Sequence, residues 1–180
     1  MGFQAGFIAV VGRPNVGKST LVNELIGQKL SITSHRPQTT RHRIHAIDTT
    51  DQYQMVFVDT PGVHIGSKKA INAYMNRAAS SSIKDVDMIL WLVEVDRWTK
   101  EDARVLEHVS QVDVPVIMCI NKIDKLSSAQ AVLPFLEKIS QKFQPTDLFP
   151  LSAFKKRDIS ALRELVLKHL PEQDMIFDAD

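Results

Sequence analysis

Short runs of consecutive apolar residues alternate along the chain with segments whose apolar residues recur at helical spacing. A run of about four to eight apolar or β-branched residues is typical of a strand with at least one buried face. Such runs predict the strands Phe7–Val11, Ile44–Thr49, Tyr53–Val58, Met88–Val95, Val116–Ile120 and Leu148–Leu151. Helical spacing predicts the helices Lys18–Gln28, Lys68–Ile83, Lys100–Val112, Ala129–Phe143 and Ile159–Leu170. Pro134 either kinks or delays the helix that contains it, and residues 29–42 carry no regular pattern, which predicts a loop.

The order of these elements predicts an α/β fold. Strands that alternate with helices form a mostly parallel sheet with helices on both faces. A turn at residues 50–52 joins two of the strands into a hairpin, which places one antiparallel strand at the edge of a six-stranded sheet. Ligands of such sheets bind beyond the carboxyl ends of the strands. The residues that follow each strand are therefore the candidates for chemistry.

A glycine-rich motif follows the first predicted strand. It reads Gly12-Arg13-Pro14-Asn15-Val16-Gly17-Lys18-Ser19-Thr20 and matches the phosphate-binding loop (P-loop), in the strand–loop–helix context that this motif requires. The glycines let the backbone wrap a phosphate, while the loop amides and the helix N-terminus point donors at the anion. Lys18 can reach the β- and γ-phosphates, and the Ser19 hydroxyl can ligate Mg²⁺. The alternative is a chance glycine-rich turn.

Polar residues also follow the third predicted strand, in the segment Asp59-Thr60-Pro61-Gly62. An acidic residue that closes a buried strand can hold Mg²⁺ through water, and the Gly62 amide can contact a γ-phosphate. Alone, Asp-x-x-Gly is a common turn. Its position downstream of a P-loop favours the nucleotide interpretation.

The segment Asn121-Lys122-Ile123-Asp124 follows the fifth predicted strand. Guanine presents its N1–H and N2–H donors side by side, so the Asp124 carboxylate can accept both, whereas adenine has no such pair. Asn121 can read the other edge of the base and tie this loop to the P-loop. The aliphatic stem of Lys122 can cover one face of the base. The alternative is an ordinary turn or a helix N-cap.

The segment Ser152-Ala153-Phe154 follows the sixth predicted strand. A backbone amide at this position can donate a hydrogen bond to guanine O6. By itself the signal is weak, because the Ser152 hydroxyl could instead cap a turn.

Composition narrows the class of protein. The chain has 180 residues, of which 44% are hydrophobic and 24% charged, as in one ordinary globular domain. No apolar run approaches the ~20 residues needed to span a bilayer, so we do not expect an integral membrane protein. The single cysteine, Cys119, cannot form an internal disulfide, which suits a reducing cytosol. A formal net charge of +1 says nothing about nucleic-acid binding, which only local charge can indicate.

In this order, the motifs resemble those of translation-factor-class P-loop GTPases. The stretches GRPNVGKSTLVNELIGQKLSITS, QTTRHRI, VDTPGVH and AINAYMNRAASSSIKDVD resemble, more narrowly, the Era family of bacterial GTPases. The resemblance covers nearly the whole chain. GRPNVGKSTL and DTPG are shared with related ribosome-assembly GTPases, whereas QTTRHRI and NRAASSSI favour Era.

The resemblance implies a cytoplasmic GTPase, with GTP or GDP and Mg²⁺ bound, that acts as a molecular switch in assembly of the small ribosomal subunit. Members of the family carry a C-terminal KH domain that binds 16S rRNA. We expect residues 1–171 to form the GTPase domain and residues 172–180 to begin an acidic linker toward a KH domain, which this sequence does not contain. The resemblance also implies a monomer and is compatible with peripheral association at the inner membrane.

The resemblance also suggests which residues act on the γ-phosphate. Thr40 is the expected switch threonine, with Thr39 as the alternative that sequence does not separate from it. Lys18, Thr40 and Gly62 are then the expected catalytic residues. Mg²⁺ would be held by Ser19, Thr40 and Asp59.

The sequence departs from the pattern of related GTPases at two places, one that concerns catalysis and one in the base-binding loop. Val63 stands where many small GTPases carry a glutamine that orients the attacking water. A hydrophobic residue cannot orient water, so the catalytic group must come from the backbone, a K⁺ ion, a partner or the substrate, and we expect slow intrinsic hydrolysis. The family usually has a glycine shortly after Ser-Ala, where this chain reads Phe154-Lys155-Lys156-Arg157. The base-binding loop is therefore expected to be more strained or more mobile.

Several alternatives stay open at this point. One is a guanine-nucleotide-dependent binding module with negligible hydrolysis of its own, which Val63 favours. Another is a P-loop kinase or ATPase, which the Asn-Lys-Ile-Asp sequence disfavours. Within the GTPases, a related ribosome-assembly factor or a tRNA-modifying GTPase domain would share most of these motifs.

Overall fold

A six-stranded sheet forms the centre of the structure. The computed structural model describes residues 2–26, 43–59 and 86–178, and of Arg43 and Asp59 it describes the backbone alone. The strands are β1 (Gln4–Val11), β2 (Arg43–Thr49), β3 (Tyr53–Asp59), β4 (Met88–Glu94), β5 (Val116–Asn121) and β6 (Asp147–Pro150). They lie in the order β2-β3-β1-β4-β5-β6, and every neighbouring pair is parallel except β2 and β3. The predicted parallel sheet with one antiparallel edge strand is confirmed.

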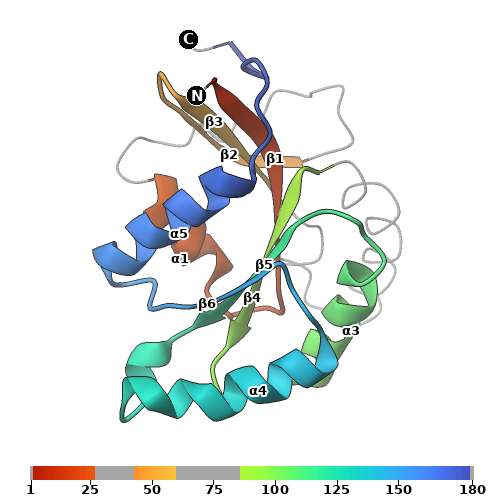
Figure 1. The fold of residues 1–180 in the computed structure, drawn as a ribbon, viewed down its shortest axis with the longest axis vertical. Helices are drawn as coiled ribbons and strands as arrows, with labels where there is room; N and C mark the ends of the chain where they lie inside the picture. The colour runs from red at the N-terminus through yellow and green to blue at the C-terminus, as the bar shows by residue number, and fades with distance from the viewer. Residues whose placement is uncertain (1, 27–42, 60–85, 179–180) are drawn as a thin grey trace.

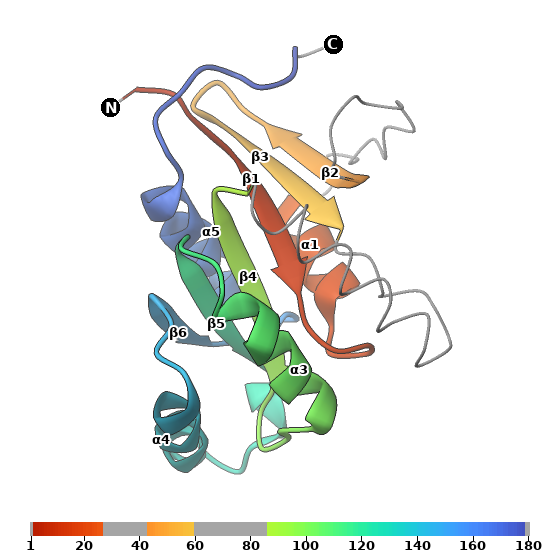
Figure 2. The same cartoon turned by 90° about the vertical axis from the view of Figure 1, so that its right-hand side faces the viewer.

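Helices cover both faces of this sheet (Figures 1 and 2). The helical elements are α1 (Lys18–Ile26), α3 (Lys100–Val109), α4 (Leu133–Lys142) and α5 (Lys156–His169), with two short 3₁₀ turns, η1 (Ile123–Lys125) and η2 (Ala129–Val132). Helices α1 and α5 lie together on one face, and α3 and α4 lie on the other, each pair over its own apolar core. The described residues therefore form three layers.

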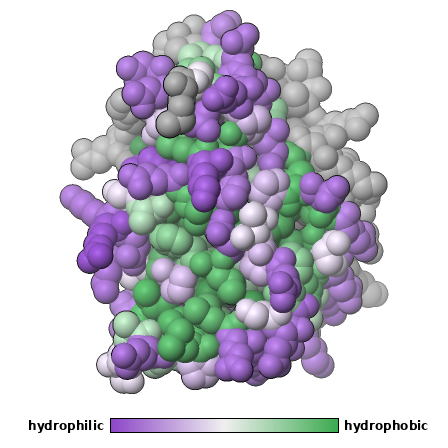
Figure 3. Space-filling view, in the orientation of Figure 1, coloured by the Kyte–Doolittle hydropathy of each residue, from purple (hydrophilic) through white to green (hydrophobic). Residues whose placement is uncertain are grey.

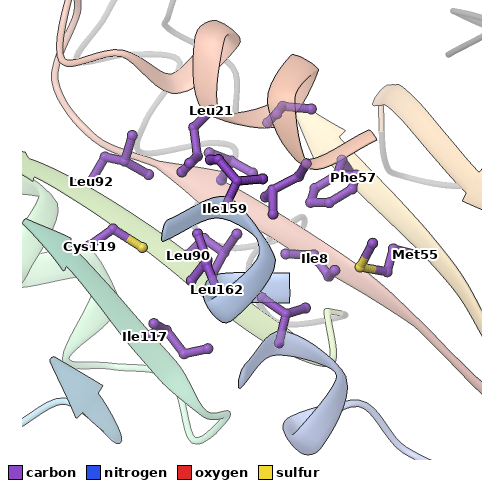
Figure 4. Close-up of a cluster of buried hydrophobic side chains, with 14 of the residues drawn as sticks. Ile8, Leu21, Met55, Phe57, Leu90, Leu92, Ile117, Cys119, Ile159 and Leu162 are labelled. Atoms are coloured by element: carbon purple, nitrogen blue, oxygen red, sulfur yellow. The ribbon is translucent and has the colours of Figure 1, made fainter. Parts of the chain in front are cut away.

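The core beneath α1 and α5 shows why the strand sequences read as unbroken apolar runs. Leu21 of α1 and Leu162 of α5 are fully buried against strand side chains such as Ile8 (Figure 4). Successive strand residues point to opposite faces of a sheet. Ala9 therefore joins the core under α3 and α4, on the other side. A strand covered on both faces needs apolar residues at consecutive positions.

Two residues of the central strands confirm their predicted place in the core. Cys119 and Trp91 both have 0% exposure. Burial raises the pKa of the Cys119 thiol to about 12, so the thiol stays protonated and unreactive at neutral pH. The Trp91 ring lies 5.9 Å from the ring of Trp98, which is partly buried and packs against this core.

Local chemistry explains where two of the helices begin. Pro134 occupies the first turn of α4 and has no amide hydrogen to lose there, so the helix begins at Leu133 after the η2 turn. Pro134 thus delays this helix. At the start of α3, Thr99 and Asp102 form a reciprocal capping box. The predicted helix at residues 68–83 and the predicted loop at residues 29–42 lie outside the described residues.

The segment after α5 lies along the amino-terminal ends of β1 and β3 (Figure 1). The Ala5 amide donates to the Pro171 carbonyl at 3.2 Å. The side chain of Gln54, which is 1% exposed, donates to the Phe177 carbonyl at 2.8 Å and accepts from the Ile176 and Phe177 amides at 2.9 and 3.0 Å. One buried carboxamide therefore fixes this segment to β3.

Replacing Gln54 with alanine is expected to lower the free energy of unfolding by about 1–3 kcal/mol, because three backbone groups lose their partner. Urea denaturation followed by circular dichroism measures this change. Gln52→Ala, in the exposed turn before β3, is the matched control and should change the free energy little. An equal effect of the two variants would show that the Gln54 contacts add nothing to stability.

Apolar residues gather in the lower half of the face shown in Figure 3, whereas polar residues cover much of its upper part. The large apolar side chains that are exposed among the described residues are Leu133, Phe154 and Met175. No helix within the described ranges has the length and apolar character that a membrane span requires.

Candidate functional site

The loop between β1 and α1 has a backbone that its glycines make possible. Gly12 and Gly17 have φ angles of +150° and +106°, which side-chain-bearing residues rarely adopt. A Cβ at Gly12 would lie 2.7 Å from the Leu92 carbonyl oxygen, and a Cβ at Gly17 would lie 2.5 Å from Asn121 Nδ2. Both approaches are closer than a side chain tolerates. The loop therefore keeps this shape only with glycine at both positions.

The first turn of α1 carries the hydroxyl and ammonium groups of the motif. Lys18 is only 8% exposed, and its Nζ donates to the Gly12 carbonyl, which folds the ammonium over the loop. Ser19 and Thr20 are exposed at the same end of the helix. The backbone amides of this turn and the Lys18 charge make the loop suited to an anion.

Asn121 joins three loops at the carboxyl edge of the sheet. Its side chain is buried and donates from Nδ2 to the Val16 carbonyl of the P-loop at 3.2 Å. Its Oδ1 accepts from the Lys122 amide at 2.8 Å and from the Ala153 amide at 3.3 Å. The predicted tie between this residue and the P-loop is therefore present in the structure.

The turn after Asn121 holds the carboxylate that the sequence assigns to base selection. Lys122 has a φ of +67°, and its Nζ lies 3.5 Å from the Asn15 carbonyl oxygen of the P-loop. Asp124 follows in η1 with an exposed side chain. The Ile123 amide donates to the Leu151 carbonyl at 3.4 Å, so this turn lies beside the segment that follows β6.

The loop from Ser152 to Phe154 borders the same region. The Ser152 amide donates to Asp158 Oδ2 at 2.8 Å, but the buried Ser152 hydroxyl has no hydrogen-bond partner among the described residues. The alternative that this hydroxyl caps a turn is therefore wrong. In addition, the N-cap residue of α5 is Lys155, and no side chain caps that helix. Phe154 is 80% exposed.

One acidic residue at this edge was not singled out by the sequence analysis. Glu94 ends β4, and its side chain is 6% exposed with Arg13 NH2 at 2.9 Å. Arg13 Nε lies 3.3 Å from Asp102 Oδ2, so the predicted P-loop residue Arg13 turns its guanidinium toward two acids. In the sequence, Glu94 is the one charged residue of the apolar run Met88–Val95, and this pattern does not identify its partners.

These elements enclose a cleft of about 430 Å³, within the usual range of ligand sites. Its lining residues are Pro14, Asn15, Gly17, Lys18, Ser19, Thr20, Asn121, Lys122, Ala153 and Phe154. The structure thus brings together residues from three separate segments of the sequence prediction, those that follow the first, fifth and sixth predicted strands. Asp59 is described only as backbone, beside Val10 in the register of β1 and β3, and Thr39, Thr40, Thr60, Pro61, Gly62 and Val63 lie outside the described residues.

The cleft fits a nucleotide with its metal ion. Its phosphate end has a glycine-shaped loop and a buried cation, and its other end is lined by Asn121, Lys122 and Ala153, beside the turn that bears Asp124. Ser19 offers a hydroxyl, and the backbone of Asp59 reaches the same edge of the sheet. Hydroxyl and carboxylate oxygens, completed by phosphate and water, are the ligands that Mg²⁺ takes in such sites.

Comparison with known proteins decides the family. Residues 7–122 match the family model described as 50S ribosome-binding GTPase. The chain belongs to this GTPase family. Within the family, it is 50% identical to GTPase Era of Yersinia enterocolitica over 175 residues, which are 97% of this chain and 58% of that protein. GTPase Era of Yersinia pestis is 49% identical over the same fractions of the two chains.

Solved structures of Era also resemble this member of the GTPase family. A crystal structure of Era with MgGDPNP and nucleotides 1506–1542 of 16S ribosomal RNA has a TM-score of 0.77 and 34% identity, and the match covers 98% of this chain and 60% of that one. An Aquifex aeolicus Era variant bound to GDP·AlF₄⁻ has a TM-score of 0.78 and 35% identity over the same shares. The chain thus spans about three fifths of the Era proteins that it matches. It has the P-loop GTPase fold of this family.

Proposed function

We propose that this chain binds guanine nucleotides and hydrolyses GTP as a molecular switch. The observation that carries the proposal is the position of Asn121, whose amide joins the P-loop to the turn that bears Asp124. A phosphate-binding end and a base-selecting end are thereby fixed to one another. Only a ligand with both parts, a nucleotide, uses both ends.

At the phosphate end, Lys18 and the P-loop amides would bind the β- and γ-phosphates. Bound Mg²⁺ would supply positive charge to the phosphate oxygens. Ser19, Asp59 through water, and Thr40 in the closed state are the proposed ligands, with Thr39 as the alternative to Thr40. The Gly62 amide is the proposed further contact to the γ-phosphate.

At the base end, the Asp124 carboxylate would accept hydrogen bonds from N1–H and N2–H of guanine. The exposed side chain of Asp124, two residues after Lys122 in the cleft lining, and the position of the Lys122 side chain near the P-loop support this proposal. The Ala153 amide donates to Asn121 Oδ1 at 3.3 Å, and this closeness to Asn121 supports the proposal that the loop contacts guanine O6. A carboxylate in this position favours guanine over adenine.

The position after Gly62 is occupied by Val63, which has no group to orient a water molecule. We therefore infer slow turnover by the chain alone, with faster turnover when K⁺ or a partner supplies the missing charge. Phosphate release from GTP, measured with Na⁺ or K⁺ and with purified small ribosomal subunits, tests this. Release that none of these raises above background would favour the second candidate, a nucleotide-dependent binding module without hydrolysis.

The ribosomal role follows from similarity to Era. The Era crystal structure contains a segment of 16S ribosomal RNA, and the match to Era extends over 98% of this chain. We propose that this chain acts in assembly of the small ribosomal subunit, with its nucleotide state controlling the association. Cosedimentation of the GTP-bound and GDP-bound chain with small subunits tests this role.

A further inference from the structure

Glu94 ends β4, and its two carboxylate oxygens contact the P-loop on one side and the turn from Lys122 to Lys125 on the other. Oε2 accepts a hydrogen bond from Arg13 NH2 of the P-loop at 2.9 Å. Oε1 lies 3.6 Å from Lys122 Nζ and 3.3 Å from Lys125 Nζ. Lys122 immediately precedes η1, and Lys125 is its last residue. One carboxylate therefore contacts both ends of the turn that carries Asp124.

The Glu94 carboxylate needs these cations because it is almost buried. Burial raises the pKa of Glu94, but the hydrogen bonds from Arg13 and Lys125 and the charge of Lys122 outweigh burial and hold the pKa below its ordinary value. The side chain therefore carries its charge at neutral pH. A buried charge in such a cluster favours arrangements that keep its cationic partners close, because each of them offsets part of the cost of burying the carboxylate.

Arg13 connects Glu94 to the P-loop and to the start of α3, and both of these segments are also held by contacts that do not involve Glu94. The P-loop is also held by Asn121, which donates to the Val16 carbonyl at 3.2 Å. The start of α3 has its own capping box, in which Asp102 accepts from the Thr99 amide at 2.8 Å. The start of η1 is held by the Lys122 amide, which donates to Asn121 Oδ1 at 2.8 Å, whereas beyond Lys122 the described contacts of the turn are short local hydrogen bonds and the 3.4 Å contact of the Ile123 amide with the Leu151 carbonyl. Loss of the Glu94 charge should therefore disturb η1 most.

We propose that Glu94 is a positioning residue for guanine selection, which acts through Lys122 and Lys125 to hold Asp124 at the guanine edge. The inference rests on the proposed function. It adds a specificity determinant on β4, outside the nucleotide-binding motifs. It also explains why an acidic side chain ends a strand whose seven residues are all buried.

The test compares GDP with IDP, whose hypoxanthine base lacks the 2-amino group and so makes one bond fewer to Asp124. Competition against a fluorescent GDP analogue gives both affinities for the wild type and for Glu94→Gln. We expect the GDP-over-IDP preference to fall about tenfold in the variant. Both nucleotides carry the same phosphates, so the ratio cancels any change at the P-loop.

Glu107→Gln, on the exposed face of α3, makes the same chemical change and should leave the ratio unchanged. If Glu94→Gln does not fold, Lys125→Gln removes one of the two lysine contacts at a 61% exposed side chain, and a twofold to threefold fall in the ratio is expected. An unchanged ratio in the folded variant would overturn the inference, because Glu94 would then be structural only. A wild type that binds GDP and ADP equally would overturn the proposed function and this inference with it.

Discussion

Replacing Asp124 with asparagine is expected to weaken GDP binding about 100-fold to 1,000-fold. The wild-type carboxylate accepts two adjacent N–H groups, and charge-assisted hydrogen bonds contribute about 1.5–3 kcal/mol each. An asparagine offers one acceptor oxygen and turns an N–H donor toward the second guanine donor. The repulsion between these two donors adds to the loss of the bond.

The same Asp124→Asn variant is expected to gain affinity for xanthosine diphosphate. Xanthine has a carbonyl oxygen at C2 in place of the guanine amino group, so an asparagine can donate to that oxygen and accept from N1–H. Competition against a fluorescent GDP analogue measures both affinities. Asp113→Asn, in the exposed loop before β5, is the matched control and should leave both unchanged. A variant that still binds GDP as the wild type does would show that Asp124 is only a turn residue.

Replacing Lys18 with alanine is expected to lower GTP affinity about 100-fold or more, because the P-loop loses the cation that faces the β- and γ-phosphates. The side chain is almost buried and its Nζ donates to the Gly12 carbonyl, so the ammonium is already held at the phosphate end of the cleft. Isothermal titration with GTP and Mg²⁺ measures the affinity. The free energy of unfolding without nucleotide, measured separately, shows whether the variant is intact.

Lys138→Ala removes an exposed lysine from α4, away from the residues that line the cleft, and is the matched control for Lys18→Ala. It should bind GTP as the wild type does. Equal GTP affinity of the folded Lys18→Ala variant and this control would contradict the assignment of Lys18 to phosphate binding.

The fold and the nucleotide motifs could be predicted because their signals are local. Each strand is a continuous apolar run, and the P-loop from Gly12 to Ser19 has fixed spacing between a strand and a helix. The link between Asn121 and the P-loop could be anticipated as well, since the carboxyl ends of neighbouring parallel strands meet at one edge. The structure shows this link at 3.2 Å.

Contacts between distant parts of the chain could not be predicted in the same way. Gln54 reads as an ordinary polar position on a half-buried strand, and its partners Ile176 and Phe177 lie more than a hundred residues away. Glu94 reads as the polar end of a strand until Arg13 and Lys125 are seen beside it. Sequence periodicity indicates which face of an element is buried, but it does not identify the partners across that face.

Base preference tests the central claim most directly. A fluorescent GDP analogue bound to the wild-type chain with Mg²⁺ is displaced in turn by GDP, GTP and ATP. We expect displacement by GDP and GTP and none by ATP at the same concentrations, because only guanine offers two donors to Asp124. Displacement by ATP at the same concentrations as GTP would contradict guanine selection and, with it, the proposed switch.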